Sequence, residues 1–215
     1  MTELKLNCRG KILDLSQRTH VMGILNVTPD SFSDGGKFFD PESAIKHALQ
    51  MEREGADIID VGAESTRPGS DAISEAEEIR RLKPVVAGLL EKLKIPISVD
   101  TYKSQVAEAM LKMGVHLIND ISGLRFDADM AHLLAKYNAP VVVMHIKGTP
   151  KDMQKNPHYD DVIQEIYTYL KNSVNLAAQA GIKKEQVIID PGIGFGKRLR
   201  DNYEIIRHLN VFDSI

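Results

Sequence analysis

The chain has 215 residues, of which 43% are hydrophobic and 27% charged, as in ordinary globular proteins. Its 27 Lys and Arg residues against 30 Asp and Glu give a formal net charge of -3, too near neutral for binding nucleic acid through bulk charge. No run reaches the roughly 18 apolar residues of a transmembrane helix, and residues 1–10 lack a signal-peptide core. The one cysteine, Cys8, excludes an intramolecular disulfide and a cysteine-based zinc site. We therefore expect a cytoplasmic protein without a membrane or nucleic-acid partner.

The chain begins with two short strand-like runs, 4–7 and 12–15, around an Arg9-Gly10 pair, a pattern that predicts a β-hairpin. After them, β-branched runs alternate with stretches whose apolar residues recur every three or four positions, as in strands and helices. The β-branched runs are apolar throughout, which favours a parallel sheet buried on both faces. The six predicted strands are 21–25, 58–61, 95–99, 117–118, 141–144 and 187–189.

The stretches between these strands carry the signals of helix ends. Asp40 followed by Pro41 predicts a helix start with proline in the first position, and Ser74 begins a capping-box pattern. Pro84 lies inside the second predicted helix and is expected to kink it. Asp201 is expected to cap the sixth helix.

Alternation of strands and helices predicts an α/β fold with a parallel sheet, either doubly wound or a (β/α)8 barrel. A barrel usually takes about 250 residues, or roughly 31 per unit, and the spacing between residues 21 and 209 follows that rhythm. Only six strand–helix units are present. We therefore expect residues 1–215 to form a single barrel domain that begins with the hairpin and lacks the last two units.

Polar residues follow the predicted strands at the end where both folds bind ligands. Asp60, Asp100 and Asp190 stand at such positions, as do Asn26 and Asn119. A carboxylate there is costly to bury unless something pairs with it. These side chains are expected to ring one cavity. The ring would suit a planar heterocycle with several N–H donors, a divalent cation, or an anion bound through one.

Each strand-end residue also has a structural interpretation. Asp100 and Asp120 would then cap the following helices, and Asn26 would be a turn residue. Asp60 would support loops through hydrogen bonds, and His145 would be a satisfied buried histidine. A polar or soft residue at the end of all six strands favours a site, because independent caps need not recur in this way.

Two loops at this end are long and polar, as mobile lids often are. The first, 28–36, is rich in Ser, Asp and Gly, and the second contains Thr66-Arg67-Pro68-Gly69. Arg67 is either a clamp for a phosphate or carboxylate or a solvated loop residue. The glycines of 190–197 form neither a Walker A motif nor a full GxGxxG, so their nucleotide signal is weak.

The longest of these runs closely resemble the dihydropteroate synthase family. The resemblance rests on MGILNVTPDSFSDGG at 22–36 and DIIDVGAESTRPG at 57–69, with shorter matches at 97–101, 118–122 and 190–197. The first two runs are long and specific, and the matches extend from the first strand to the sixth helix. The family fold is a (β/α)8 barrel, in agreement with the spacing argument.

The resemblance implies a reaction. It joins 6-hydroxymethyl-7,8-dihydropterin diphosphate to p-aminobenzoate, releasing pyrophosphate and 7,8-dihydropteroate. The enzyme would stabilise the departing pyrophosphate, hold a cationic pterin and position the amine. The resemblance also implies Mg2+, which neutralises the leaving group, and a homodimer.

The resemblance assigns a role to residues that match the family motifs. Asn26 resembles the residue that helps hold Mg2+ and pyrophosphate, and Asp34 resembles a first-loop residue that reaches the metal. Thr66 and Arg67 resemble second-loop residues near the diphosphate. Asp100, Asn119 and Asp190 resemble the residues that read the pterin's donor and acceptor edge. Pocket-lining residues implied in the same way are Met144 and Phe195 for the pterin, and Phe32 and Pro68 for p-aminobenzoate.

The family also carries a Ser-Arg-Lys segment on its seventh strand and an Arg-x-His pair on its eighth, and we expect both to lie beyond residue 215. A non-catalytic pterin-binding fragment is therefore an alternative. A methyltetrahydrofolate:corrinoid methyltransferase shares the fold and pterin site, but it should lack the two long loops at 28–36 and 65–69. A barrel acting on a sugar phosphate is a third alternative.

Overall fold

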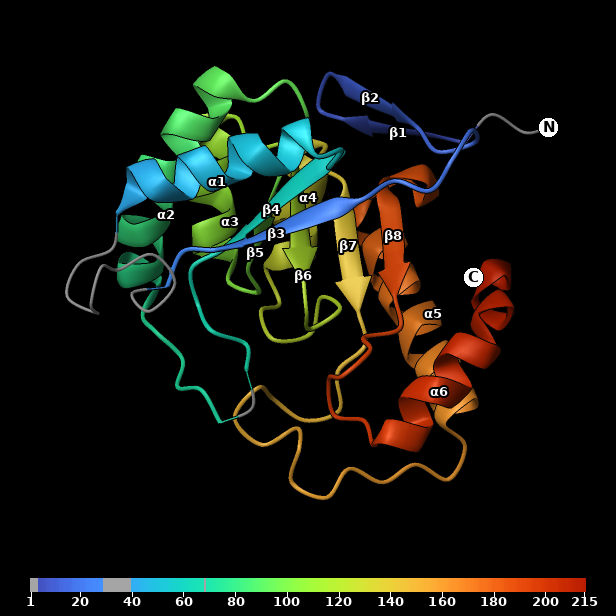
Figure 1. Ribbon diagram of the computed structural model, residues 1–215. Coiled ribbons are helices and arrows are strands. Elements are labelled where there is room, and N and C mark those ends of the chain that lie inside the picture. The colour runs from blue at the N-terminus through green and yellow to red at the C-terminus, as the bar shows by residue number, and fades with distance from the viewer. Residues whose placement is uncertain (1–3, 29–39, 68) are drawn as a thin grey trace.

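The computed structural model describes residues 4–28, 40–67 and 69–215, and from β3 onward its strands and helices alternate (Figure 1). An antiparallel hairpin comes first, made of β1 (Lys5–Cys8) and β2 (Lys11–Asp14). Six parallel strands then form one sheet in the order of the sequence. They are β3 (Met22–Asn26), β4 (Ile58–Gly62), β5 (Ile97–Asp100), β6 (Leu117–Asp120), β7 (Val141–Met144) and β8 (Val187–Asp190).

Each strand of the sheet is followed by an α-helix, so the six predicted strand–helix units are confirmed. The strands extend beyond their apolar runs, because the parallel pairing continues into the polar residues at their ends. The helices are α1 (Pro41–Arg53), α2 (Glu75–Lys92), α3 (Ser104–Met113), α4 (Met130–Tyr137), α5 (Val162–Ala180) and α6 (Leu199–Arg207), with 3-10 turns η1 (Lys184–Gln186) and η2 (Leu209–Ser214).

Local sequence signals explain most helix ends. The carboxylate of Asp40 accepts hydrogen bonds from two backbone N–H groups of the first turn of α1, and Ser74 accepts one in α2. Helix α2 runs on with Pro84 inside it. The expected cap at Asp201 is wrong in detail, since Asp201 lies within the first turn of α6. There it accepts a 2.9 Å hydrogen bond from the backbone N–H of Arg198 and pairs with that side chain.

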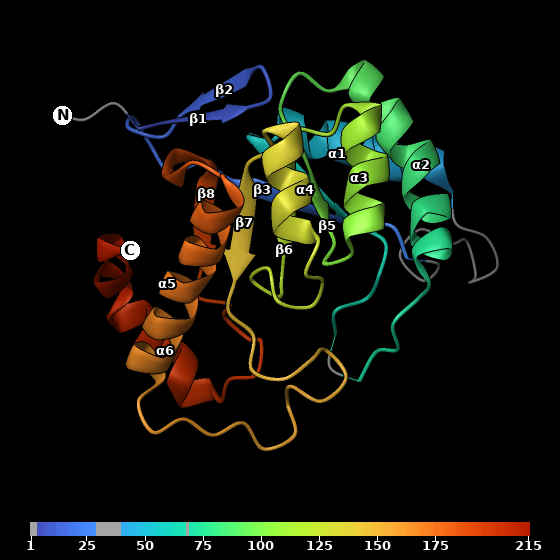
Figure 2. The same cartoon turned by 180° about the vertical axis from the view of Figure 1, so that it is seen from behind.

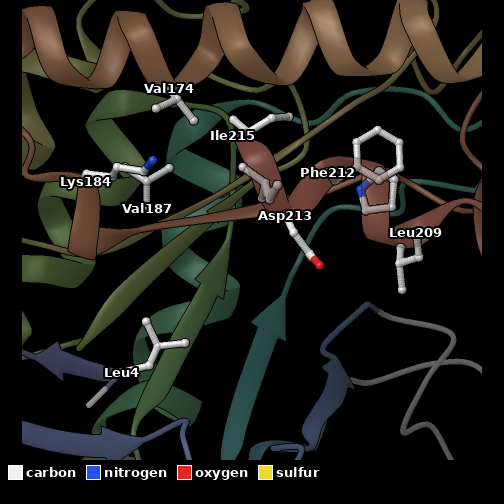
Figure 3. A pocket seen from close by; sticks show the side chains of 10 residues that line it. Leu4, Val174, Lys184, Val187, Leu209, Phe212, Asp213 and Ile215 are labelled. Carbon is white, nitrogen blue, oxygen red and sulfur yellow. The ribbon is translucent and has the colours of Figure 1, made fainter. Parts of the chain in front are cut away.

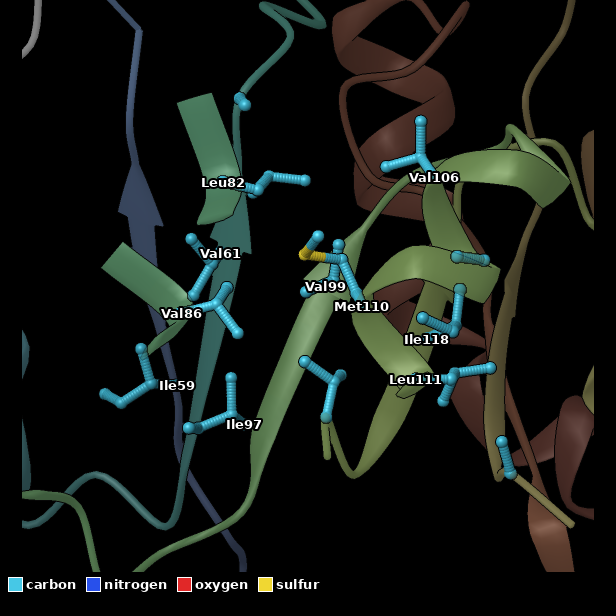
Figure 4. Packing of buried hydrophobic residues seen from close by; sticks show 14 of the residues in the cluster. Ile59, Val61, Leu82, Val86, Ile97, Val99, Val106, Met110, Leu111 and Ile118 are labelled. Atoms are coloured by element: carbon cyan, nitrogen blue, oxygen red, sulfur yellow. The ribbon is translucent and has the colours of Figure 1, made fainter. Parts of the chain in front are cut away.

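The main core lies between the sheet and its helices (Figures 2 and 4). Side chains alternate between the two faces of a strand, so every second strand residue points toward the helices. The strand residues Ile59, Val61, Ile97, Val99 and Ile118 belong to the same buried cluster as Leu82 and Val86 of α2 and Val106, Met110 and Leu111 of α3. This packing holds the strands in fixed positions, and with them the polar side chains at the strand ends.

The opposite face of the sheet is closed at one end by the hairpin. Leu6 and Cys8 of β1 pack with Ile58, Leu117 and Val142, all near the beginnings of their strands. The hairpin therefore lies where the parallel strands start, and the loops that follow the strands lie at the other end (Figure 1). That second end carries the polar residues that end the strands.

The edges of the sheet are β3 and β8, and within the described ranges neither pairs with a further strand on its outer side. Ile24 of β3 is 56% exposed. Beside β8, a cavity of about 470 Å³ opens between α5 and η2 (Figure 3). It is lined mainly by apolar side chains, among them Val174, Val187 and Phe212, and by none of the predicted site residues. In the described ranges no helix has the length and apolarity that a membrane crossing requires.

Candidate active site at the carboxyl ends of the strands

Strand register brings the predicted polar residues together. Asn26 pairs with Gly62, Gly62 with Asp100, and Asp100 with Asn119, across four neighbouring strands. Residues opposite one another in a ladder point to the same face, so the three polar side chains share the face that the helices do not cover. On β8, Asp190 pairs with Met144. The frame of strands thus gathers the predicted ring at one end of the sheet.

Gly62 leaves space in the middle of this row. A Cβ atom at Gly62 would lie 3.3 Å from Oδ2 of Asp100 and 3.7 Å from Oδ1 of Asn26. A larger side chain would occupy the volume between these two polar groups. The glycine therefore keeps the oxygens of Asn26 and Asp100 open to a ligand.

A buried carboxylate lies below this row. Asp60 is 2% exposed, and its Oδ2 accepts a 2.9 Å hydrogen bond from Nδ2 of Asn119. Oδ1 of Asp60, Oδ1 of Asn119 and Oγ of Ser98 are buried and have no hydrogen-bond partner among the described residues. Buried polar atoms in folded proteins are nearly always hydrogen-bonded, so these oxygens indicate a place for a ligand or an ordered water.

The surroundings of two of these aspartates raise the pKa of their side chains. Burial, followed by repulsion from Asp60 and Glu78, raises the pKa of Asp100 well above its ordinary value. Burial also raises the pKa of Asp190, against a hydrogen bond from the backbone of Gly192 and the positive charge of Lys197. Such shifts are common at functional sites. A ligand that brings N–H donors or positive charge to this end of the sheet would relieve the repulsion.

The loop after β8 is held tightly against the end of β7. Oδ1 of Asp190 accepts a 2.7 Å hydrogen bond from the backbone N–H of Gly192. Gly192 has φ +69°, and a Cβ there would lie 2.0 Å from the carbonyl oxygen of His145, so only glycine fits. The same loop packs Phe195 against the cluster that contains Met144, which is 3% exposed. The two predicted pterin-pocket residues therefore belong to one cluster.

Two strand-end residues have structural roles instead. Asp120 accepts hydrogen bonds of 2.8 and 3.0 Å from the backbone N–H groups of Ser122 and Leu124, so it caps a turn. His145 is 4% exposed, and its Nδ1 lies 2.9 Å from Nζ of Lys197. Asp120 therefore has a structural role, but it caps a turn and not the following helix, whose N-cap is Asp129. His145 is a buried histidine with a partner, as expected.

The second loop follows β4 at the same end of the sheet. It carries Thr66, which is half-buried, and Arg67, which is exposed. A 3.0 Å hydrogen bond from the backbone N–H of Gly69 to the carbonyl oxygen of Pro150 links this loop to the one after β7. The remaining predicted loop residues, Phe32, Asp34 and Pro68, lie outside the described residues.

Sequence reasoning missed the ion network that anchors this loop. Nζ of Lys103 lies 2.6 Å from Glu64 and 2.7 Å from Glu78, and both carboxylates are buried. The hydroxyl of Tyr102 donates a 2.6 Å hydrogen bond to Glu64. These residues come from different units, and no periodic pattern links them. The Glu-Ser-Thr-Arg-Pro-Gly run gave a partial signal, since its glutamate stands two residues after the end of β4.

Comparison with known proteins identifies the family. Residues 22–215 match the family described as "Pterin binding enzyme". The dihydropteroate synthase of Clostridium beijerinckii is 49% identical over 200 residues, which are 93% of this chain and 72% of the relative. The chain belongs to the dihydropteroate synthase family. The methyltransferase alternative is therefore set aside.

Solved structures of this family share the fold. The dihydropteroate synthase of Xanthomonas albilineans with 4-aminobenzoic acid superposes with a TM-score of 0.92 at 44% identity, over 100% of this chain and 76% of that one. A complex of the same enzyme with 7,8-dihydropteroate superposes with a TM-score of 0.85 at 40% identity, over 98% of this chain and 74% of that one. The α/β fold with its N-terminal hairpin is thus that of dihydropteroate synthases, of whose length this chain spans about three quarters.

Proposed function

We propose that this chain binds 6-hydroxymethyl-7,8-dihydropterin diphosphate and condenses it with p-aminobenzoate to give 7,8-dihydropteroate and pyrophosphate. One observation carries the proposal. Asp100, Asn119 and Asp190 stand at the same end of a family-matched sheet, where buried acceptor oxygens have no partner within residues 4–28, 40–67 and 69–215. The relative's complex with 7,8-dihydropteroate supports the same product for this chain.

Pterin recognition would follow from acceptor chemistry. The pterin edge carries several N–H groups, and an ionised carboxylate only accepts hydrogen bonds. Asp100 and Asp190 would accept hydrogen bonds from ring and amino N–H groups, and the amide of Asn119 would complete the edge. Met144 and Phe195, which share one cluster, would form the apolar wall that holds the ring.

The chemical step is a displacement at the pterin CH2 carbon. The amine nitrogen of p-aminobenzoate forms a bond to this carbon, the C–O bond to the diphosphate breaks with its electrons, and the nitrogen then loses a proton. Positive charge that develops on the pterin would be stabilised by the carboxylates of Asp100 and Asp190, which are already fixed in place. Thr66 and Arg67 would hold the diphosphate, since a guanidinium forms paired hydrogen bonds with phosphate oxygens.

Magnesium would neutralise the pyrophosphate as it leaves. The described residues contain no group of three His, Cys, Asp or Glu side chains placed to hold a metal. Mg2+ favours oxygen ligands and is usually bound through one or two protein groups, waters and substrate phosphates. The open amide oxygen of Asn26 fits that pattern, and Asp34 is proposed to join it.

A homodimer and a cytoplasmic location are also proposed. Leu199, Tyr203 and Ile206 lie along one side of α6 and are 73%, 64% and 61% exposed. Three large apolar residues at this spacing form a stripe that association would bury. The cytoplasmic location is supported by the single, buried Cys8, because secreted proteins of this size often carry disulfides.

Product detection by mass spectrometry tests the proposal. The purified chain is incubated with the dihydropterin diphosphate, p-aminobenzoate and Mg2+. Dihydropteroate should appear with the wild type and with Asp129→Asn, an exposed control on another loop. It should be lost with Asp190→Asn. Binding of the pterin without any product would favour the non-catalytic fragment, and no pterin binding at all would overturn the proposal.

A further inference from the structure

Asp60 is a buried carboxylate inside the sheet. It stands on β4 two residues before Gly62, on the same uncovered face, with Ser98 of β5 as its register partner. Its Oδ2 accepts a hydrogen bond from another side chain, that of Asn119, and not from a helix end or a turn. Burial raises the pKa of Asp60, and the neighbouring side chains of Ser98 and Asn119 oppose this shift.

The contact with Asp60 decides which way the amide of Asn119 faces. A primary amide has a donor end and an acceptor end of nearly the same shape, whereas an ionised carboxylate only accepts hydrogen bonds. Nδ2 of Asn119 is therefore directed to Oδ2 of Asp60 at 2.9 Å. The acceptor Oδ1 is turned the other way, and it is buried without a hydrogen-bond partner in the part of the chain that the structure describes.

We propose that Asp60 is a positioning residue that orients the amide of Asn119, so that the pocket presents a carbonyl oxygen and selects ligands with an N–H donor there. The proposal rests on the proposed function, because the ligand is the pterin. Asp60 itself need not touch the ring. Without Asp60, the amide of Asn119 would be free to turn its N–H groups toward the ligand's own N–H. The hydrogen bond from the ligand to Oδ1 of Asn119 would then be lost.

Calorimetric binding of 6-hydroxymethylpterin tests this role. In Asp60→Asn the new amide can donate or accept, so Asn119 no longer has one favoured orientation. Affinity should fall by about five- to tenfold, the worth of about one hydrogen bond. The matched control is Asp120→Asn, on the helix-facing side of β6. It is expected to keep the pterin affinity within twofold even where its thermal midpoint falls.

A side-chain exchange separates orientation from general support of the fold. In the double variant Asp60→Asn/Asn119→Asp, the amide at position 60 donates to one carboxylate oxygen at 119, and the other oxygen faces the pocket as an acceptor. Affinity should recover to within about threefold of the wild type. The single variant Asn119→Asp sets two carboxylates together and should bind less well than the double variant.

The outcomes are distinct. If the wild type does not bind the pterin, the proposed function is overturned and this inference with it. If the wild type binds and a folded Asp60→Asn binds equally well, the inference is wrong while the function stands. If the double variant folds but recovers no affinity relative to both single variants, Asp60 does not act through the amide. Should Asp60→Asn fail to fold, the comparison of Asn119→Asp with the double variant decides between these results.

Discussion

Nζ of Lys197 lies 2.9 Å from Nδ1 of His145, and both side chains are almost fully buried. The same ammonium group donates hydrogen bonds to the carbonyl oxygens of His145 and Phe195, at 3.2 and 2.9 Å. It therefore fastens the loop after β8 to the end of β7. Burial lowers the pKa of Lys197 to about 7 and that of His145 to about 3.

This pair predicts a particular dependence of stability on pH. An unfolded lysine titrates near pH 10.4, so between about pH 7 and 10 the unfolded chain binds a proton that the folded chain releases. The free energy of unfolding should then rise with pH in this window, by at most about 1.4 kcal/mol per pH unit. Urea denaturation across the window should show this rise in the wild type and its loss in Lys197→Met. Equal slopes would contradict a depressed Lys197 pKa.

Removal of the Lys103 ammonium group is expected to lower the free energy of unfolding strongly. Its ammonium group lies between Glu64 and Glu78, which are 8% and 1% exposed. Lys103→Met would leave two buried carboxylates without their cation, which typically costs about 3–5 kcal/mol. Urea denaturation at neutral pH measures the loss, and the second loop should become more susceptible to proteolysis.

The matched control for this variant is Lys112→Met. Lys112 pairs with Glu108 at 3.1 Å on the surface of α3, and its side chain is 60% exposed. An exposed pair of this kind contributes about 0.5 kcal/mol or less. Similar losses for the two variants would show that the buried network is not what anchors the loop.

The substitution Gly62→Ala is expected to lower the activity without lowering the stability of the fold. In Gly62→Ala the new methyl group would lie 3.3 Å from the Asp100 carboxylate and would fill the space beside Asn26. The kcat/KM for the dihydropterin diphosphate should fall about tenfold or more, while the midpoint of thermal unfolding changes little. A fully active variant would show that ligand does not use this space.

The apolar stripe on α6 predicts the oligomeric state. Ile206→Glu places a charge within the stripe, where a dimer interface would have to bury it without a partner. Light scattering should give a dimer for the wild type and a monomer for the variant. Arg207→Glu, on the neighbouring position, serves as the control for added negative charge. A wild-type monomer, or a dimer unaffected by Ile206→Glu, would refute the proposed interface.

The order of elements was predictable because it rests on local periodicity. Apolar runs became β3 to β8, and capping residues such as Asp40 and Ser74 began the helices where expected. Asp201 was misplaced by a few residues, since a first-turn carboxylate and a capping carboxylate both accept backbone N–H groups. Which strand-end residues share a face was only partly predictable. Adjacent strand residues such as Asn119 and Asp120 point to opposite faces of the sheet. Strand register then decides which residues of neighbouring strands lie side by side, as Asp100 and Asn119 do.

By itself, the sequence determined the α/β fold class, the six units, the hairpin and the family, because these follow from periodic apolar patterns and long specific motifs. Only the tertiary structure decided which atoms meet. It paired Asp60 with Asn119, enclosed Lys103 between two glutamates and set Lys197 against His145. These partners lie between 25 and 59 residues apart in the chain. Contacts of that separation are set by parallel register and loop packing, for which no local pattern exists.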